Sequence, residues 1–120
     1  MKIFPDPSEG AEICCTAFIY RMLESMIFIA DKLGKTEDTA TYKNAREKIC
    51  DAFDKKFYKA DKGIYETTIW RELGVRTKYR QTSNLLPIAF GMVPEENKKT
   101  VLENLVKDII GKDYHFDTGC

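Results

Sequence analysis

The chain has 120 residues, of which 43% are hydrophobic and 32% are charged, and its 19 basic side chains equal its 19 acidic ones in number. This length fits one small domain or a part of a larger one, and the composition is that of a globular protein rather than a disordered one. Because the net charge is zero and the lysines at 55–62 are interleaved with aspartates, the sequence predicts no nucleic-acid-binding surface.

The first predicted helix follows a leader, residues 1–12, in which Pro5 and Pro7 prevent regular helix. This leader lacks the basic start and apolar core of a signal peptide, and the sequence leaves open whether the parent protein is cytoplasmic or exported. The helix runs from about Glu12 to Leu33 and is apolar on most sides, so we expect it to be enclosed by neighbours. Arg21 and Glu24 interrupt its apolar run, which favours a buried helix over a membrane span.

The second predicted helix runs from about Glu37 to Tyr58, with Thr36 as its N-cap. It has a single apolar stripe and is otherwise charged, so it shows one face to a core and the other to water. The stripe consists of Tyr42, Ala45, Ile49, Ala52, Phe53 and Phe57. Residues 59–63 are predicted to form a turn, since Asp61 and Gly63 are typical turn residues.

Residues 64–81 have no helical period and are predicted to form a long loop, with at most a short extended or helical piece. A loop of this length in a compact domain usually has a function. The third predicted helix, from about Thr82 to Gly91, is almost wholly apolar and takes Thr82 as its cap. The fourth, from Pro94 to Ile110, is amphipathic, and its apolar face is formed by Val101, Leu105, Val106 and Ile109.

An apolar helix thus alternates twice with a one-sided helix. This pattern predicts an all-α fold of alternating inner and outer hairpins, because inner helices of a double-layered toroid are enclosed while outer helices touch only the inner ring. If helices alternate up and down, segments 1–12, 64–81 and 112–120 lie on one face, and the short connections 34–36 and 91–94 lie on the other. We expect function on the face with the longer segments.

The sequence predicts no cofactor and no metal site. His115 is the only histidine, and no glycine motif that would bind phosphate is present. The four cysteines, Cys14, Cys15, Cys50 and Cys120, lack the C-x-x-C spacing and are predicted to be buried thiols.

Three segments resemble the catalytic domain of bacterial α-L-rhamnosidases: ADKLGKTEDTATYKNAREKICDAFDKKFYKADKGIY, QTSNLLPIAFGMVPEE and HFDTG. The resemblance extends from about residue 12 to the end and implies an (α/α)6 barrel, of which residues 1–120 would be a partial domain of about two hairpins. It implies a parent glycoside hydrolase that cleaves terminal α-L-rhamnosides with inversion. The family's acidic catalytic loop lies upstream of the matched region and its general-base Glu lies downstream, so no catalytic residue is assigned here and the isolated chain is expected to be inactive.

Four residues are candidates for binding sugar in the intact enzyme. His115 would donate a hydrogen bond, or else pack within its loop, and Trp70 would stack on a sugar ring, or else pack on a helix. Gln81 could bind a hydroxyl group, or else be solvated, and Asp117 could accept backbone N–H groups of a following helix or contact the sugar.

Two alternative functions stay open from the sequence. One is a different (α/α)6 glycosidase, similar to a trehalase or a glucosidase, and the other is a helical-repeat interaction module. For a fragment of a barrel we expect a dimer or higher assembly, or helices rearranged relative to the parent barrel, because a slice leaves part of its apolar inner helices uncovered.

Overall fold

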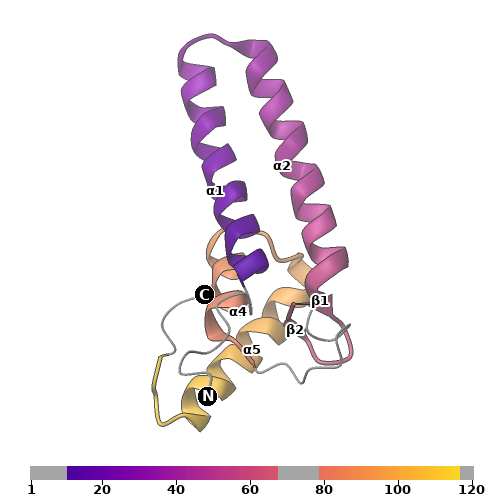
Figure 1. Ribbon diagram of the computed structural model, residues 1–120, viewed down its shortest axis with the longest axis vertical. Coiled ribbons are helices and arrows are strands. Elements are labelled where there is room, and N and C mark those ends of the chain that lie inside the picture. Colours follow the sequence, from indigo (N-terminus) through magenta and orange to yellow (C-terminus); the bar gives the residue numbers. More distant parts are fainter. Residues whose placement is uncertain (1–10, 68–78, 117–120) are drawn as a thin grey trace, which may run out of the picture.

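The computed structural model describes residues 11–67 and 79–116 (Figure 1). These residues form the helices α1 (Ala11–Lys32), α2 (Thr36–Phe57), α4 (Gln81–Ala89) and α5 (Glu95–Gly111). Two short antiparallel strands, β1 (Tyr58–Lys59) and β2 (Ile64–Tyr65), enclose the predicted turn. The all-α prediction is confirmed, and each helix begins and ends within two residues of its predicted bounds.

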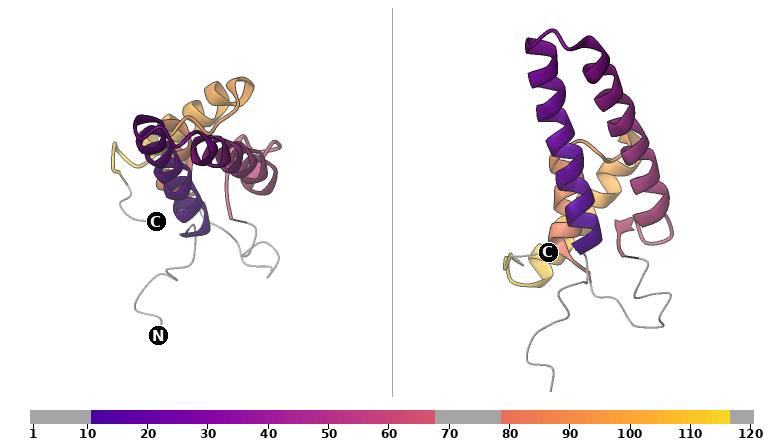
Figure 2. Two further views of the ribbon diagram at one scale, coloured as in Figure 1. Left: turned by 90° about the horizontal axis from the view of Figure 1, so that it is seen from above. Right: turned by 45° about the horizontal axis from the view of Figure 1, so that its top comes forward.

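The helices form two hairpins. Figure 1 shows α1 and α2 as a long upright pair, with α4 and α5 at and below its lower end. α1 packs against both α2 and α4, so it joins the two hairpins. In Figure 1 and in the right view of Figure 2, the 33–35 turn lies at the far tip of the first hairpin, well beyond the second hairpin.

The core lies where the two hairpins and the strands meet. Phe53 is its centre: the ring is 1% exposed and lies with its centroid 5.1 Å from that of Phe57 and 5.2 Å from that of Tyr65. The other core residues come from α1, α5 and the connection between α4 and α5: Ile13, Ala17, Tyr20, Met92, Val93 and Val101.

The β-hairpin is fixed to α5 by a glycine. Gly63 has a φ of +66°, and a Cβ at this position would overlap the side chain of Thr100. The close approach allows Asn104 Nδ2 to donate hydrogen bonds to the carbonyl oxygens of Lys62 and Gly63, at 3.1 and 3.0 Å. Glycine is therefore required both by the backbone conformation and by the space.

The two predicted threonine caps are wrong. α2 begins one residue and α4 two residues earlier than expected for such caps, after Lys35 and Arg80, and no side chain caps the start of either helix. In each helix the side chain of the fourth residue instead donates a hydrogen bond to the carbonyl oxygen of the residue that precedes the helix. Thr39 Oγ1 donates to the Lys35 carbonyl at 3.0 Å, and Asn84 Nδ2 donates to the Arg80 carbonyl at 2.9 Å.

The predicted enclosure of α1 holds on one side only. Ile13, Ala17 and Tyr20 are buried, whereas the opposite side carries exposed apolar residues, among them Met22 at 52% and Ile29 at 56%. By length and composition α1 is also a possible membrane span, a test that core helices of soluble proteins pass as well.

α5 departs from its predicted apolar face at one position. Val101 and Leu105 are buried as expected, but Val106 is 45% exposed. The reason is geometric, because Val106 lies one helical position further round than Leu105 and points away from the core.

Candidate functional site

The ends of several elements meet on one face of the molecule, which we call the loop face (Figures 1 and 2). It comprises Glu12 at the start of α1, Glu66 and Thr67 after β2, Gln81 at the start of α4, and His115 after α5. The Thr67 hydroxyl donates to the Glu12 carboxylate, and Gln81 Nε2 donates to the His115 carbonyl at 3.1 Å. The predicted convergence of the three long segments is confirmed for their described parts.

Gln81 ties the loop face to α5. The residue is only 3% exposed, and its Nε2 donates to Asp108 Oδ2 at 2.9 Å as well as to the His115 carbonyl. A glutamine amide has two N–H hydrogens, so both are used within the chain. The side chain that was predicted to bind sugar therefore also holds the segment that carries His115.

The His115 side chain is exposed on the loop face. Its backbone is held by a tight turn after α5, in which Asp113 and Tyr114 adopt positive φ values of 54° and 61°. The Tyr114 N–H donates to the Ile109 carbonyl at 2.9 Å, and the His115 N–H donates to the Lys112 carbonyl at 3.1 Å. The imidazole is thus presented to solvent from a fixed backbone. Trp70 and Asp117, the other two predicted contacts, lie outside the described residues.

Three carboxylates near this face are each engaged by a cation. Glu12 lies 3.4 Å from Lys56 Nζ, and the buried Glu66 lies 3.2 Å from Lys62 Nζ. Asp108 lies 3.0 Å from Lys112 Nζ and also accepts the hydrogen bond from Gln81. Glu12 thus links α1 to α2 and Asp108 links α5 to α4 through Gln81, whereas the Glu66–Lys62 pair joins residues only four apart.

Asn84 fixes the strand that leads into the loop face. It is fully buried, and its Oδ1 accepts a hydrogen bond from the Tyr65 N–H at 2.8 Å. Its Nδ2 donates to the carbonyl oxygens of Tyr65, at 3.1 Å, and Arg80, at 2.9 Å. The Asn84 side chain therefore forms hydrogen bonds with the Tyr65 backbone of the kind that a further neighbouring strand would form. It thereby positions Glu66 and Thr67, which follow Tyr65.

Comparison with known proteins decides the family. Residues 5–120 match the family described as the bacterial α-L-rhamnosidase six-hairpin glycosidase domain. The chain belongs to this family. The predicted resemblance is confirmed, and the two observed hairpins are consistent with part of a six-hairpin domain.

One curated relative extends the comparison. An α-L-rhamnosidase of Formosa agariphila is 33% identical over 104 residues, which cover 87% of this chain and 10% of the relative. The chain thus spans about a tenth of the length of the relative that it matches. No solved structure matches the chain.

Tyr65 is a buried tyrosine of this rhamnosidase-family chain. Its Oη donates to Asp54 Oδ1 at 2.7 Å, and burial together with this carboxylate raises the pKa of Tyr65 well above its usual value. The pKa of Tyr79, which lies two residues before Gln81, is also raised, by burial and by the nearby charge of Asp108. Both phenols stay protonated through the neutral range.

We expect the stability of the chain to fall at alkaline pH in part because of Tyr65. In the unfolded chain this phenol ionises near pH 10, whereas in the folded chain its raised pKa keeps it protonated, so rising pH above about 10 favours unfolding. Between about pH 9 and 11, the melting temperature of Tyr65→Phe should fall less steeply with rising pH than that of the wild type. Parallel curves for the two proteins would show that Tyr65 ionises equally in both states.

The cysteine prediction is correct for Cys14 and wrong for Cys15. Cys14 is buried, but its neighbour points to the outer side of α1 and is exposed. Cys50 is half-buried and its Sγ donates to the Met92 carbonyl at 3.3 Å; burial and then the charges of Asp51 and Asp54 raise the pKa of this thiol. Cys120 lies outside the described residues.

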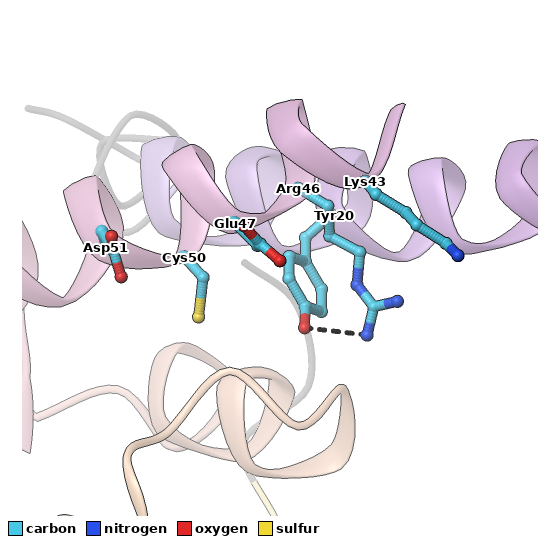
Figure 3. A pocket seen from close by; sticks show the side chains of 6 residues that line it. All are labelled: Tyr20, Lys43, Arg46, Glu47, Cys50 and Asp51. Atoms are coloured by element: carbon cyan, nitrogen blue, oxygen red, sulfur yellow. Dashed lines mark hydrogen bonds between the residues drawn. The ribbon is translucent and has the colours of Figure 1, made fainter. Parts of the chain in front are cut away.

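A hollow of about 430 Å³ lies midway along the first hairpin, away from the loop face (Figure 3). Tyr20 contributes from α1, and its hydroxyl accepts a hydrogen bond from Arg46 Nη2 at 3.1 Å, while the guanidinium lies 4.8 Å from the ring centroid. The remaining lining residues come from α2: Lys43, Glu47, Cys50 and Asp51. Within the described part of the chain, no group of three His, Cys, Asp or Glu side chains could hold a metal ion. We take the loop face as the candidate site because the long segments meet there.

Proposed function

We propose that the intact protein containing this domain is a glycoside hydrolase that removes terminal α-L-rhamnose from its substrates with inversion at the anomeric carbon. The match of residues 5–120 to the rhamnosidase family carries this proposal, and the name of the Formosa relative supports it. The partner is accordingly a carbohydrate, which would be bound on the loop face.

Inverting hydrolysis needs a carboxylic acid that protonates the leaving oxygen and a carboxylate that activates water, about 6.5–9.5 Å apart. Glu12, Glu66 and Asp108 are each held by a lysine, so they are poorly placed to supply this pair. We assign the acid and the base to parts of the intact protein outside residues 1–120, because the resemblance to the rhamnosidase family implies that they lie upstream and downstream of the matched region. In this assignment the chain supplies scaffold and sugar contacts.

The sugar contacts proposed for this chain are His115, Trp70 and Asp117, whereas Gln81, which is buried with both amide hydrogens used within the chain, is proposed to act by position rather than by contact. The exposure of the His115 side chain on a rigidly held turn supports a role as hydrogen-bond partner of a sugar hydroxyl. Gln81 supports that role indirectly, because its amide fixes the His115 backbone.

An aryl α-L-rhamnoside tests the proposal. We expect the full-length protein to release the phenol and to give β-L-rhamnose as the first product, visible by NMR before mutarotation. The isolated 120 residues should give no turnover under the same conditions. Cleavage of another glycoside but not of the rhamnoside would refute the proposed substrate, and turnover by the isolated chain would refute the placement of the catalytic acids.

We also propose that the isolated chain self-associates. The exposed apolar side of α1 supports this, since apolar surface of this extent favours contact with another surface over contact with water.

A further inference from the structure

The turn that presents His115 needs support from outside itself. Asp113 and Tyr114 adopt positive φ values of 54° and 61°, which are unfavourable for residues other than glycine. Such a backbone persists only where neighbouring groups hold it. Among the described residues, the hydrogen bond from Gln81 Nε2 to the His115 carbonyl is the one that reaches residues 113–115 from another helix. The position of His115 therefore depends on the orientation of one amide group.

The orientation of the Gln81 amide is set by its two partners. An amide side chain can be turned end for end, which exchanges its oxygen and its nitrogen. Gln81 Nε2 lies 2.9 Å from Asp108 Oδ2 and 3.1 Å from the His115 carbonyl oxygen, and both of these atoms are acceptors. The turned amide would place its own oxygen against the same two atoms, and neither a carboxylate nor a carbonyl can donate to it. Asp108 therefore excludes the turned orientation.

Asp108 is itself held in place. Its Oδ2 lies 3.0 Å from Lys112 Nζ, and its side chain is 20% exposed. A hydrogen bond to a charged acceptor is stronger than one between neutral groups, so the bond to Asp108 anchors the Gln81 amide more firmly than the bond to the His115 carbonyl does. The carboxylate thus connects the start of α4 to the turn that follows α5.

We propose that Asp108 is a positioning residue for sugar binding, which fixes the Gln81 amide so that this amide holds the backbone of His115 where its imidazole contacts the sugar. The inference rests on the proposed function, which gives His115 a sugar to contact. Asp108 acts through Gln81 and does not touch the sugar. Its loss should weaken substrate binding in the ground state and in the transition state alike, so KM rises while kcat is unchanged.

The kinetics of the full-length protein with an aryl α-L-rhamnoside test this role. In Asp108→Ala, KM should rise by about 5- to 10-fold and kcat should stay within about twofold. Asp108→Asn retains a carbonyl oxygen that can accept from Gln81, so its KM should stay within about threefold of the wild type. Asp51→Ala makes the same change at an exposed position of α2, away from the loop face, and is the matched control with an unchanged KM.

A double variant tests whether Asp108 acts through Gln81. Gln81→Met removes both hydrogen bonds with little change of shape, so Asp108→Ala/Gln81→Met should have the same KM as Gln81→Met alone. Effects on KM that multiply would overturn the inference, and so would an unchanged KM or a large fall of kcat in Asp108→Ala. If the alanine variant does not fold, Asp108→Leu, which keeps the volume, carries the same expectation.

Hydrogen exchange of the full-length protein separates this inference from the proposed function. In Asp108→Ala the Tyr114 and His115 amides should exchange faster, while peptides around Phe53 keep the wild-type rate. Unchanged exchange at Tyr114 and His115, or faster exchange around Phe53 as well, would overturn the positioning role even in an active rhamnosidase. A wild type that cleaves no rhamnoside would overturn the proposed function and the sugar contact, but locally faster exchange would still support the link from Asp108 to His115.

Discussion

Replacement of Asn84 by alanine is expected to lower the free energy of unfolding by about 3 kcal/mol or more, because it leaves buried backbone groups without partners. The Tyr65 N–H and the Tyr65 carbonyl oxygen depend on this one side chain, which also donates to the Arg80 carbonyl. Each unsatisfied buried group costs about 1–3 kcal/mol. Urea denaturation followed by circular dichroism measures the change.

Asn44→Ala is the matched control, since Asn44 is exposed on α2 and its loss should change the free energy of unfolding by less than about 0.5 kcal/mol. Asn84→Asp adds a second arm. It keeps an acceptor for the Tyr65 N–H but turns a carboxylate toward two carbonyl oxygens, so at neutral pH it should also be strongly destabilising. Equal stabilities of the Asn84 and Asn44 alanine variants would contradict the role assigned to this amide.

Phe53→Ala is expected to lower the free energy of unfolding by about 3–5 kcal/mol, as is typical for truncating a buried aromatic side chain. The ring is 1% exposed and contacts the rings of Phe57 and Tyr65, so its removal leaves a cavity at the junction of α2 with the β-hairpin. If this variant does not fold, Phe53→Leu gives a measurable intermediate loss, because it retains most of the apolar volume.

Phe28→Ala removes the same ring from an exposed position, since Phe28 is 64% exposed on α1. Its effect on the free energy of unfolding should stay within about 0.5 kcal/mol. Because both substitutions remove the same side chain, the difference between their losses of unfolding free energy measures the contribution of burial. A loss for Phe28→Ala as large as that for Phe53→Ala would mean that α1 packs on another surface in solution.

The helices were predictable because their signals are local. Apolar spacings of three and four placed α1, α2 and α5 to within two residues. Gly34 and Gly91 marked the ends of two helices, and in the structure both adopt the positive φ values that favour glycine at such positions. The alternation of apolar and one-sided helices, a property of whole segments, was enough to predict which ends would meet.

The contacts that shape the loop face could not be predicted in the same way, because they join residues far apart in the sequence. Asn84 stands in an apolar run, and only this contrast marks it as a buried hydrogen-bonding residue; that its partner is Tyr65 follows from the tertiary fold alone. Likewise, nothing near Gln81 in the sequence indicates that Asp108 and the His115 backbone will use its amide hydrogens. The exposure of Cys15 and Val106 depends on which neighbours are present.

The tip of the first hairpin, where the 33–35 turn projects past the second hairpin, is expected to open at a lower free energy than the core around Phe53 (Figure 1). Opening of this tip separates α1 from α2 locally and leaves the core around Phe53 intact, so it costs less than global unfolding. Gly34 has no atom within 4 Å of the position that a Cβ would take. Because the φ of Gly34 is +68°, which favours glycine, a fluorescent label or an inserted peptide is best placed in this turn beside Gly34 rather than in its position, at a distance from both the loop face and the core.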